Sequence, residues 1–265
     1  MPRILVLVLL TCFVFTVNPA HAQKLYAILV GDTQDASIGN GIAANLKNMD
    51  SFLDAVEMDG KITISKIEIK GDNFNCKKIN EAVEQLNVEP SDAVLFYYSG
   101  HGFRRDSTQT QFPEFDCRRT LDPDRAELSG IVDNLVKAKK PKFLLAIADT
   151  CNKESTAFIA APPAGFAPAE KQAAFRRLFQ GYSGTLIMSG SIPGEYSWYT
   201  VAGGSLGGFF TNQLLQAINQ KIKEQRSNVR WEDIASDATK TIFIPGPAEP
   251  TYQHPQSAAL NLVGP

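Results

Sequence analysis

The chain has 265 residues, 44% of them hydrophobic, and a formal net charge of −2. This length and apolar content are enough to bury one sizeable core. The near-neutral charge gives no electrostatic case for a nucleic-acid partner or for an anionic membrane surface. The sequence also contains no internal repeat and no glycine-rich phosphate loop.

Residues 1–22 have the pattern of a secretory signal peptide. Arg3 supplies the positive charge, residues 4–17 form an apolar stretch, and Ala20-His21-Ala22 is an A-x-A cleavage site. The apolar stretch is short for a membrane span and no second one follows. We therefore expect a protein exported to the periplasm or outside the cell, with no stable membrane span after signal removal. An uncleaved anchor is the alternative.

The mature chain at residues 23–265 begins with strands that alternate with helices. Strands are predicted at residues 24–31 and 62–69 and in the apolar runs that lead to His101 and Cys151. The apolar faces of the intervening helices are Ile42, Leu46, Met49, Leu53 and Val56, then Ile79, Ala82, Val83 and Leu86, then Leu128, Ile131, Val132 and Leu135. This alternation predicts an α/β fold with a mostly parallel central sheet and helices on both faces.

Turn and capping residues mark several boundaries. Asp59-Gly60 is predicted to end the first helix, and Asn73 or Asn75 to cap the second. Residues 103–124 are polar and predict a long loop. Residues 160–168 are rich in proline and small residues and are not expected to pack regularly. Beyond them, a short helix at residues 170–179, a strand at 185–188, a helix after residue 207 and another near Trp231 are expected.

His101 and Cys151 are the candidate catalytic residues. Each follows an apolar run that stops abruptly at small and polar residues, AVLFYYSGHG at residues 93–102 and KFLLAIADTC at 142–151. In open α/β sheets, ligands bind in the crevice beyond the carboxyl ends of the strands. A thiol and an imidazole at that edge suit a cysteine nucleophile and its base. The alternatives are a buried apolar cysteine and a structural histidine; His254 is the other histidine left after signal removal.

Signal removal leaves three cysteines, Cys76, Cys117 and Cys151. An oxidising compartment permits one disulfide and leaves one free thiol. If Cys151 is the nucleophile, Cys76 and Cys117 can pair, although both can equally remain reduced. No CxxC or CxxxC spacing occurs, so a zinc site has little support. We predict no cofactor and no metal, and leave calcium dependence open.

The motif SGHG, followed fifty residues later by a cysteine after an acidic residue, resembles the caspase-like cysteine peptidases. IADTC departs from the QAC-x-G of animal caspases and is similar to the Asp-x-Cys of metacaspases and bacterial caspase homologues. The metacaspase His-Ser-Gly after the cysteine is absent, while the tail from Gln253 resembles their Gln-x-Pro-Gln ending. The resemblance implies a three-layer α/β sandwich, with a large-subunit-like part at residues 23–152, a linker at 153–183 and a small-subunit-like part at 184–265.

The resemblance also implies roles for individual residues. It assigns the oxyanion-binding N–H groups to Gly102 and Cys151, and no third triad member is evident, so we predict a Cys–His dyad. Asp32 and Asp149 end strands at the same rim, where two carboxylates suit a guanidinium or ammonium group. These positions resemble the acidic S1 residues of metacaspases. Asp32 is alternatively a turn or helix-capping residue.

Other residues bear on the substrate. Arg104 and Arg105 follow His101 and favour the opposite preference, cleavage after Asp. Ser189 and Ser191 end the next strand and are candidates for binding the substrate backbone, or are ordinary strand-end residues. Lys171, Arg176 and Arg177 are candidate self-cleavage positions in a segment expected to be mobile. A solvated basic helix is the alternative.

The sequence therefore predicts an exported caspase-like cysteine endopeptidase that cuts peptide or protein substrates after Arg or Lys. One rival is a caspase-fold pseudo-enzyme that binds peptides or partners without turnover. Another is a different Cys–His hydrolase of the cell envelope. Activity on a peptide panel separates the three.

Overall fold

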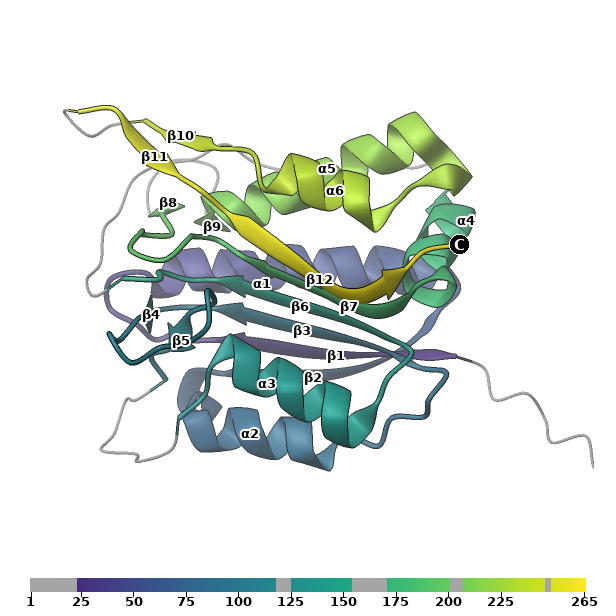
Figure 1. The fold of residues 1–265 in the computed structure, drawn as a ribbon, viewed down its shortest axis with the longest axis horizontal. Helices are drawn as coiled ribbons and strands as arrows, with labels where there is room; N and C mark the ends of the chain where they lie inside the picture. Colours follow the sequence, from purple (N-terminus) through teal and green to yellow (C-terminus); the bar gives the residue numbers. More distant parts are fainter. Residues whose placement is uncertain (1–22, 118–124, 154–170, 201–206, 246–248) are drawn as a thin grey trace, which may run out of the picture.

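The computed structural model describes residues 23–117, 125–153, 171–200, 207–245 and 249–265. A six-stranded sheet forms the middle layer, and helices cover both of its faces (Figure 1). The predicted α/β sandwich with a mostly parallel sheet is confirmed. The expected signal peptide and the proline-rich stretch at residues 160–168 lie outside the described residues.

The strands of the sheet lie in the order β12-β7-β6-β3-β1-β2. Every neighbouring pair is parallel except β12 and β7, which are antiparallel. The strands are β1 (Lys24–Gly31), β2 (Thr63–Lys70), β3 (Ala93–Ser99), β6 (Phe143–Asp149), β7 (Ser183–Ser189) and β12 (Gln256–Val263). The central strands β3 and β6 are therefore neighbours that run in the same direction.

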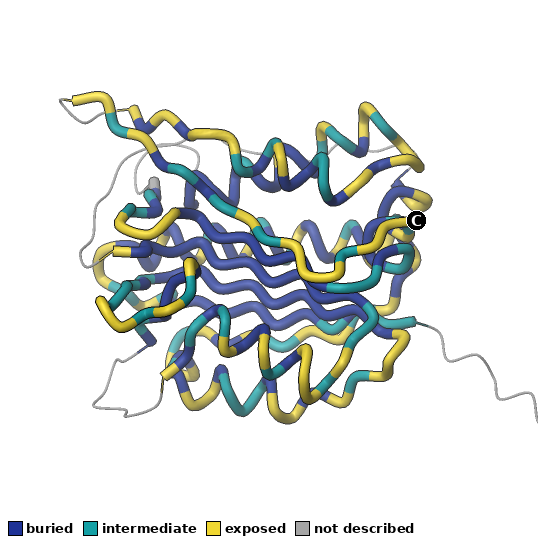
Figure 2. The backbone as a smooth tube through the Cα atoms, viewed as in Figure 1, coloured by how far each residue is buried: buried dark blue, intermediate teal, exposed yellow. Residues whose placement is uncertain are grey.

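Two hydrophobic clusters, one on each face of the sheet, explain why the central strands are apolar throughout. Along β3, Leu95 and Tyr97 pack into one cluster, while Phe96 and Tyr98 pack into the other. The cluster with Leu95 contains residues of α1 (Gly39–Met58), α4 (Lys171–Arg176), α5 (Phe209–Gln225) and α6 (Trp231–Ala238). The opposite cluster contains residues of α2 (Cys76–Gln85) and α3 (Leu128–Asn134). Figure 2 shows the strands buried between these layers.

Short elements complete the chain. The antiparallel pairs outside the sheet are β4 (Gly102–Phe103) with β5 (Glu114–Phe115), β8 (Tyr199–Thr200) with β9 (Gly207–Gly208), and β10 (Ile242–Ile244) with β11 (Thr251–Gln253). The single-turn helices are η1 (Gly71–Asn73), η2 (Leu135–Lys139), η3 (Arg177–Gly181) and η4 (Arg226–Asn228). In Figure 1, β4, β5, β8 and β9 gather at the left, beyond the carboxyl ends of the parallel strands.

The boundary predictions hold where a specific interaction fixes them. The side chain of Asn75 accepts a hydrogen bond of 2.8 Å from the Lys78 amide, so Asn75 rather than Asn73 caps α2. Helix α1 ends at Asp59-Gly60, where a side chain on Gly60 would come within 2.4 Å of the Val56 carbonyl oxygen. Helix α6 begins at Trp231, as expected.

One prediction is corrected, one strand was missed, and one segment is more closely packed than expected. The polar stretch at residues 103–124 is not simply a loop, because it contains β5, which pairs with β4, and Cys117, which forms a disulfide with Cys76. The edge strand β12 was not predicted; most of its residues are partly or fully exposed, so no buried apolar run marks it. In the described end of the expected linker, residues 171–181 form α4 and η3, which agrees with the helix predicted at residues 170–179, and several of their side chains are buried.

Candidate active site

The strand register brings the two candidate catalytic residues to one edge of the sheet. Ser99 of β3 pairs with Asp149 of β6, and the Gly100 amide continues the pairing with a 3.3 Å hydrogen bond to the Asp149 carbonyl. His101 and Cys151 each lie two residues beyond this pair. The apolar runs therefore deliver the imidazole and the thiol to equivalent positions on neighbouring parallel strands.

Close packing at Gly102 holds the two strand ends together. A side chain at this position would come within 2.1 Å of the Thr150 hydroxyl oxygen and 2.6 Å of the Cys151 carbonyl oxygen. Only a residue without a Cβ fits such an approach. The resemblance implied an oxyanion-binding N–H group at this glycine, and the structure adds a separate, intramolecular reason for a residue without a side chain. The roles of the Gly102 and Cys151 amides as oxyanion donors stay predictions.

The Cys151 thiol is protected in this structure. The residue is 5% exposed, and its Sγ donates a hydrogen bond of 3.5 Å to the Ser197 carbonyl. Burial raises the pKa of the thiol to about 11, because it disfavours the charged thiolate. Among the described residues, Cys151 is the free cysteine.

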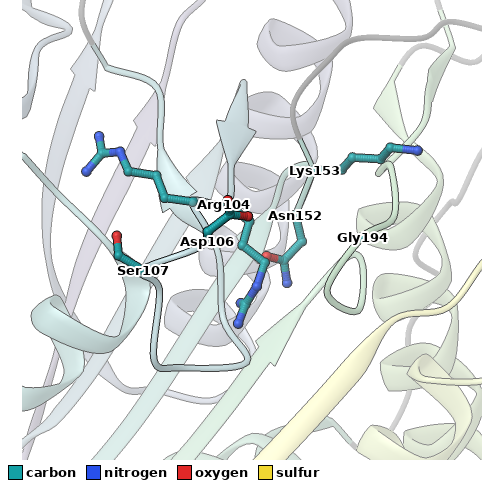
Figure 3. Close-up of a pocket in the computed structure, with 7 residues that line it drawn as sticks. Arg104, Asp106, Ser107, Asn152, Lys153 and Gly194 are labelled. Atoms are coloured by element: carbon teal, nitrogen blue, oxygen red, sulfur yellow. The ribbon is translucent and has the colours of Figure 1, made fainter.

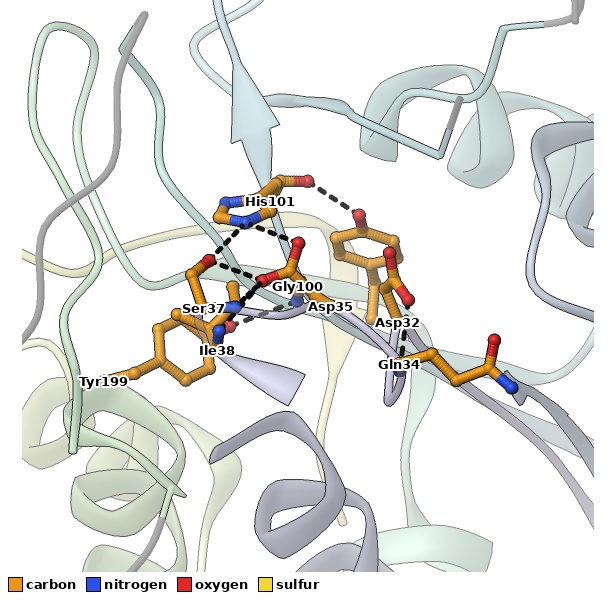
Figure 4. Close-up of polar contacts among 9 residues, drawn as sticks. Asp32, Gln34, Asp35, Ser37, Ile38, Gly100, His101 and Tyr199 are labelled. Atoms are coloured by element: carbon orange, nitrogen blue, oxygen red, sulfur yellow. Dashed lines mark hydrogen bonds and ion pairs between the residues drawn. The ribbon is translucent and has the colours of Figure 1, made fainter. Parts of the chain in front are cut away.

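His101 is held by its backbone and by its ring (Figure 4). Its carbonyl accepts hydrogen bonds from the Tyr98 hydroxyl at 2.6 Å and from the Asp116 amide at 2.9 Å. Its ring atom Nε2 lies 3.2 Å from Asp35 Oδ2 and 3.4 Å from the Ser37 hydroxyl oxygen. The polar contacts of this ring are thus with the segment that follows β1, while the thiol bonds to Ser197.

Asp149 is fully buried and accepts hydrogen bonds at both carboxylate oxygens. Its Oδ1 accepts from the Ser197 hydroxyl at 2.6 Å. Its Oδ2 accepts from the side-chain amide of Asn45 at 3.2 Å. The same oxygen accepts from the backbone amide and the hydroxyl of Thr211 at 3.0 and 2.6 Å. Burial raises the pKa of Asp149, and these hydrogen bonds act against that rise. The carboxylate joins β6 to α1, to the first turn of α5 and to the segment before β8.

Asp32 follows β1, next to β3 in the sheet, and is 7% exposed. Its Oδ1 accepts a 3.3 Å hydrogen bond from the Gln34 amide, which is the turn interaction that we weighed against substrate binding. The predicted acidic rim thus has one carboxylate that is almost buried and one that is fully enclosed. A bound guanidinium would meet Asp149 only if the hydrogen bonds to Asp149 were rearranged. The role of both residues in substrate binding stays a prediction.

Ser189, the last residue of β7, and Ser191, just beyond it, are buried, and their hydroxyls bond within the chain. Ser189 donates to the Ser191 carbonyl at 3.3 Å, and Ser191 donates to the Thr150 carbonyl at 3.0 Å. They therefore tie the end of β7 to the segment that carries Cys151. Their predicted contact with the substrate backbone stays a prediction.

A groove with a cavity volume of about 940 Å³ lies beside the residues that follow Cys151 (Figure 3). Its lining consists of Arg104, Arg105, Asp106, Ser107, Asn152, Lys153 and Gly194. The Arg105 guanidinium pairs with Glu114 at 3.0 Å, and the Arg104 guanidinium donates to the Thr108 carbonyl at 3.0 Å. Both arginines therefore have partners within the chain, although the groove carries more basic than acidic side chains.

His254 lies away from the candidate dyad. Its Nδ1 pairs with Glu195 Oε1 at 2.8 Å, and its amide donates to Glu195 Oε2 at 3.0 Å. The Glu195 carbonyl in turn accepts a 2.9 Å hydrogen bond from the Asn152 amide. This histidine thus supports the segment that packs against Cys151, which agrees with a structural role.

The three basic self-cleavage candidates are bound to the folded chain. Lys171 is buried and lies 3.5 Å from the Asp59 carboxylate. Arg176 donates to the Gly60 carbonyl at 3.1 Å, and Arg177 to the Val229 carbonyl at 3.0 Å. Self-processing at these residues stays a prediction, and it now requires that α4 and η3 open first.

The sequence analysis missed several residues that shape the site. Asp35 and Ser37 contact His101, and Ser197 binds both Cys151 and Asp149. The sequence does offer Tyr199, as a residue that walls the pocket or merely packs, and its hydroxyl donates to the Asp149 carbonyl. The Tyr199 hydroxyl also accepts a 3.1 Å hydrogen bond from the Gly100 amide. The only sequence signal for Asp35 was its place in the polar turn after the first strand. Among the residues that the structure describes, no group of three or more His, Cys, Asp or Glu side chains gathers to hold a metal ion.

Comparison with known proteins identifies the class to which this fold and these strand ends belong. The sequence matches the family model described as the caspase domain over residues 24–254. The chain therefore belongs to the caspase-domain family, whose members are caspase-like cysteine peptidases. No curated protein sequence matches the chain.

A solved structure agrees with this assignment. The fold is similar to the crystal structure of caspase-1 from Spodoptera frugiperda, with a TM-score of 0.53 over 91% of this chain and 88% of that chain. The two sequences are 14% identical, so this likeness bears on the fold alone.

Proposed function

We propose that the chain is an exported cysteine endopeptidase in which Cys151 is the nucleophile and His101 the base. The observation that carries this proposal is the register of β3 and β6, which pairs Ser99 with Asp149 and places the two residues at equivalent positions beyond that pair. Membership of the caspase-domain family supports the same reaction class.

The reaction follows from the chemistry of the two groups. His101 accepts the thiol proton, and the thiolate of Cys151 forms a bond to the carbonyl carbon of the scissile peptide. The Gly102 and Cys151 amides donate hydrogen bonds to the oxyanion. The carbon–nitrogen bond then breaks, the leaving amine takes the proton from His101, and water hydrolyses the thioester with His101 again as the base.

Cleavage after Arg or Lys is the specificity that the two strand-end carboxylates support. Asp32 and Asp149 lie at the carboxyl ends of β1 and β6, where a basic side chain finds opposite charge. The basic lining of the groove beside Asn152 favours the contrary preference. Cleavage of peptides that differ only in having Arg, Lys or Asp at P1 decides between these two surfaces.

Export is supported by the signal-like residues 1–22 and by the disulfide between Cys76 and Cys117. Disulfides persist in oxidising compartments and are rare in the cytosol. Across the described residues, the structure contains no helix with the length and apolar character of a membrane span. Sequencing the N-terminus of the protein recovered from the compartment outside the cytoplasm tests this part, with residue 23 expected first.

A pseudo-enzyme is the second candidate, and the resting thiol favours it. Cys151 is buried and bonded to Ser197, and its raised pKa leaves little thiolate at neutral pH. Catalytic contacts are often long in a free enzyme and tighten when substrate binds, so peptidase activity remains the stronger proposal.

The decisive experiment combines turnover with labelling. The mature chain is assayed on the P1 peptide panel and treated with an Arg-containing electrophilic peptide, and the adduct is located by mass spectrometry. We expect turnover of the Arg and Lys peptides and an adduct on Cys151. Cys151→Ala and His101→Ala should each lose turnover while keeping the wild-type circular dichroism spectrum. If the chain binds peptides but cleaves none, it is a pseudo-enzyme. If it cleaves only amide bonds of the cell envelope, it is the different Cys–His hydrolase named as a rival above.

A further inference from the structure

The turn after β1 carries a carboxylate to the candidate base. Asp35 Oδ2 lies 3.2 Å from His101 Nε2, and the two side chains are 22% and 19% exposed. The contact joins residues 66 positions apart in the sequence, so the fold rather than local spacing creates it. Figure 4 shows both side chains together with the Ser37 hydroxyl.

The two oxygens of this carboxylate have different partners. Oδ1 accepts from the Ser37 amide at 2.8 Å, from the Ile38 amide at 2.9 Å and from the Ser37 hydroxyl. Oδ2 is the oxygen that contacts the imidazole. A residue that only capped the turn before α1 would need one carboxylate oxygen, here Oδ1. Capping therefore does not explain the contact between Oδ2 and His101.

Asp35 is held as a charged acceptor. Burial would raise the pKa of this carboxyl, but the hydrogen bonds from Ser37 and Ile38 and the neighbouring His101 outweigh burial, and the pKa is lowered. An ionised carboxylate accepts hydrogen bonds and donates none. The His101 nitrogen that faces it must therefore carry the proton of the neutral imidazole.

We propose that Asp35 is a positioning residue that holds His101 as the Nε2–H tautomer and so leaves Nδ1 as the nitrogen that accepts the Cys151 proton. The inference rests on the proposed function for the role of the imidazole. The backbone of His101 is already fixed, because its carbonyl accepts hydrogen bonds from Tyr98 and Asp116. The remaining freedom of His101 is rotation and tautomerism of its ring. A carboxylate on one ring nitrogen restricts both, as an orienting carboxylate does in other catalytic triads.

Asp35→Asn isolates this role. The asparagine carbonyl can still accept from the Ser37 and Ile38 amides, so the turn is retained. Its amide NH₂ then faces His101 Nε2 and donates to it, which favours the opposite tautomer. We expect kcat to fall by roughly 10²- to 10⁴-fold, the typical contribution of general acid–base catalysis, with about 10⁴ the loss seen when a triad carboxylate becomes an amide. KM should change little, because Asp35 does not touch the substrate.

A readout independent of turnover accompanies the kinetics. In ¹⁵N spectra of the imidazole, recorded on the Cys151→Ala background, the Nε2–H tautomer should dominate with Asp35 and give way to Nδ1–H in Asp35→Asn. Asp72→Asn is the matched control, since it removes the same charge from a residue that accepts a 2.9 Å hydrogen bond from the side-chain amide of Gln34. It should leave both the tautomer and kcat unchanged. Asp35→Ser, which keeps a capping hydroxyl, replaces Asp35→Asn if that variant does not fold.

Each outcome decides a separate question. Wild-type kcat and an unchanged tautomer in folded Asp35→Asn, with Cys151→Ala inactive, would overturn the positioning role and leave the proposed function intact. A loss of kcat with no change of tautomer would also overturn it. If the wild-type chain cleaves no peptide, the proposed function fails, and the ¹⁵N spectra alone then decide whether Asp35 sets the state of His101.

Discussion

Alkylation of Cys151 should be slow at neutral pH and should keep accelerating into the alkaline range. In the resting structure the thiol is buried and donates to the Ser197 carbonyl, and burial raises its pKa to about 11. Alkylating reagents react with the thiolate and not with the thiol. The pH dependence of the alkylation rate therefore reports directly on this resting arrangement.

The expected size of the effect follows from the fraction of thiolate. At pH 8, a thiol with a pKa of about 11 is roughly 0.1% ionised, against roughly a quarter for an ordinary thiol with a pKa of about 8.5. This is a difference of roughly 200-fold. A more basic thiolate is also the better nucleophile. With a Brønsted coefficient of about 0.4–0.5, each Cys151 thiolate reacts roughly tenfold faster than an ordinary thiolate, which offsets part of this difference. Reaction of Cys151 with iodoacetamide at pH 8 should thus be about 20-fold slower than reaction of an ordinary accessible thiol, such as that of glutathione. Burial of the sulfur should slow it further.

The assay measures adduct formation at Cys151 by mass spectrometry from pH 6 to about pH 11. We expect a tenfold rise in rate per pH unit with no plateau below pH 10. His101→Ala should give the same profile, because the resting thiol is bonded to Ser197 and not to the imidazole. A plateau below pH 7 that disappears in His101→Ala would refute the reasoning, since it would show a thiolate–imidazolium pair already formed at rest.

Four further changes test the structure around the site. Cys76→Ala, with its partner cysteine also replaced, should lower the free energy of unfolding in urea by roughly 4 kcal/mol, the chain-entropy value for a separation of 41 residues; an unchanged midpoint would contradict this. Gly102→Ala should abolish turnover by forcing the strand ends apart, whereas the helical control Gly130→Ala, which meets only a flexible glutamate side chain, should keep activity and gain about 0.5–1 kcal/mol of stability. Asp149→Asn should lower stability by about 1–3 kcal/mol because it places an amide donor among hydrogen-bond donors. Asp32→Asn should instead reduce kcat/KM for Arg peptides more than it lowers the melting temperature; a preference for Asp at P1 would show that the acidic pocket is wrongly assigned.

The central layer of the fold was predictable from the sequence because burial on both faces leaves a direct mark. Strands β3 and β6 are buried along their whole length, and such strands appear as unbroken apolar runs. Their abrupt ends located His101 and Cys151. The edge strand β12 carries no comparable mark, because most of its residues are partly or fully exposed.

The surroundings of the two candidate residues depend on tertiary packing that no spacing encodes. Asp32 and Asp35 lie in the same polar turn, and the path of that turn decides that Asp35 contacts His101. Asp149 was identified as a strand-end carboxylate, but its enclosure comes from Asn45 and Thr211, which are distant in sequence. The basic residues of α4 and η3 suggested an accessible linker, whereas their contacts with backbone carbonyls bind them to the core.

The position of the disulfide has a consequence for any cut in the chain. Both of its cysteines precede Cys151, so it encloses His101 in a covalent loop but leaves everything after the nucleophile untethered. A cut between residues 153 and 171 would give two polypeptides that separate equally under reducing and non-reducing denaturing conditions. One would carry the imidazole and the thiol, and the other the Ser197 carbonyl that holds the thiol at rest. Non-covalent contacts alone would then keep the thiol and the group that restrains it together: the β6–β7 pairing, the packed side chains, and hydrogen bonds such as those from Ser197 to Asp149 and from Asn152 to Glu195.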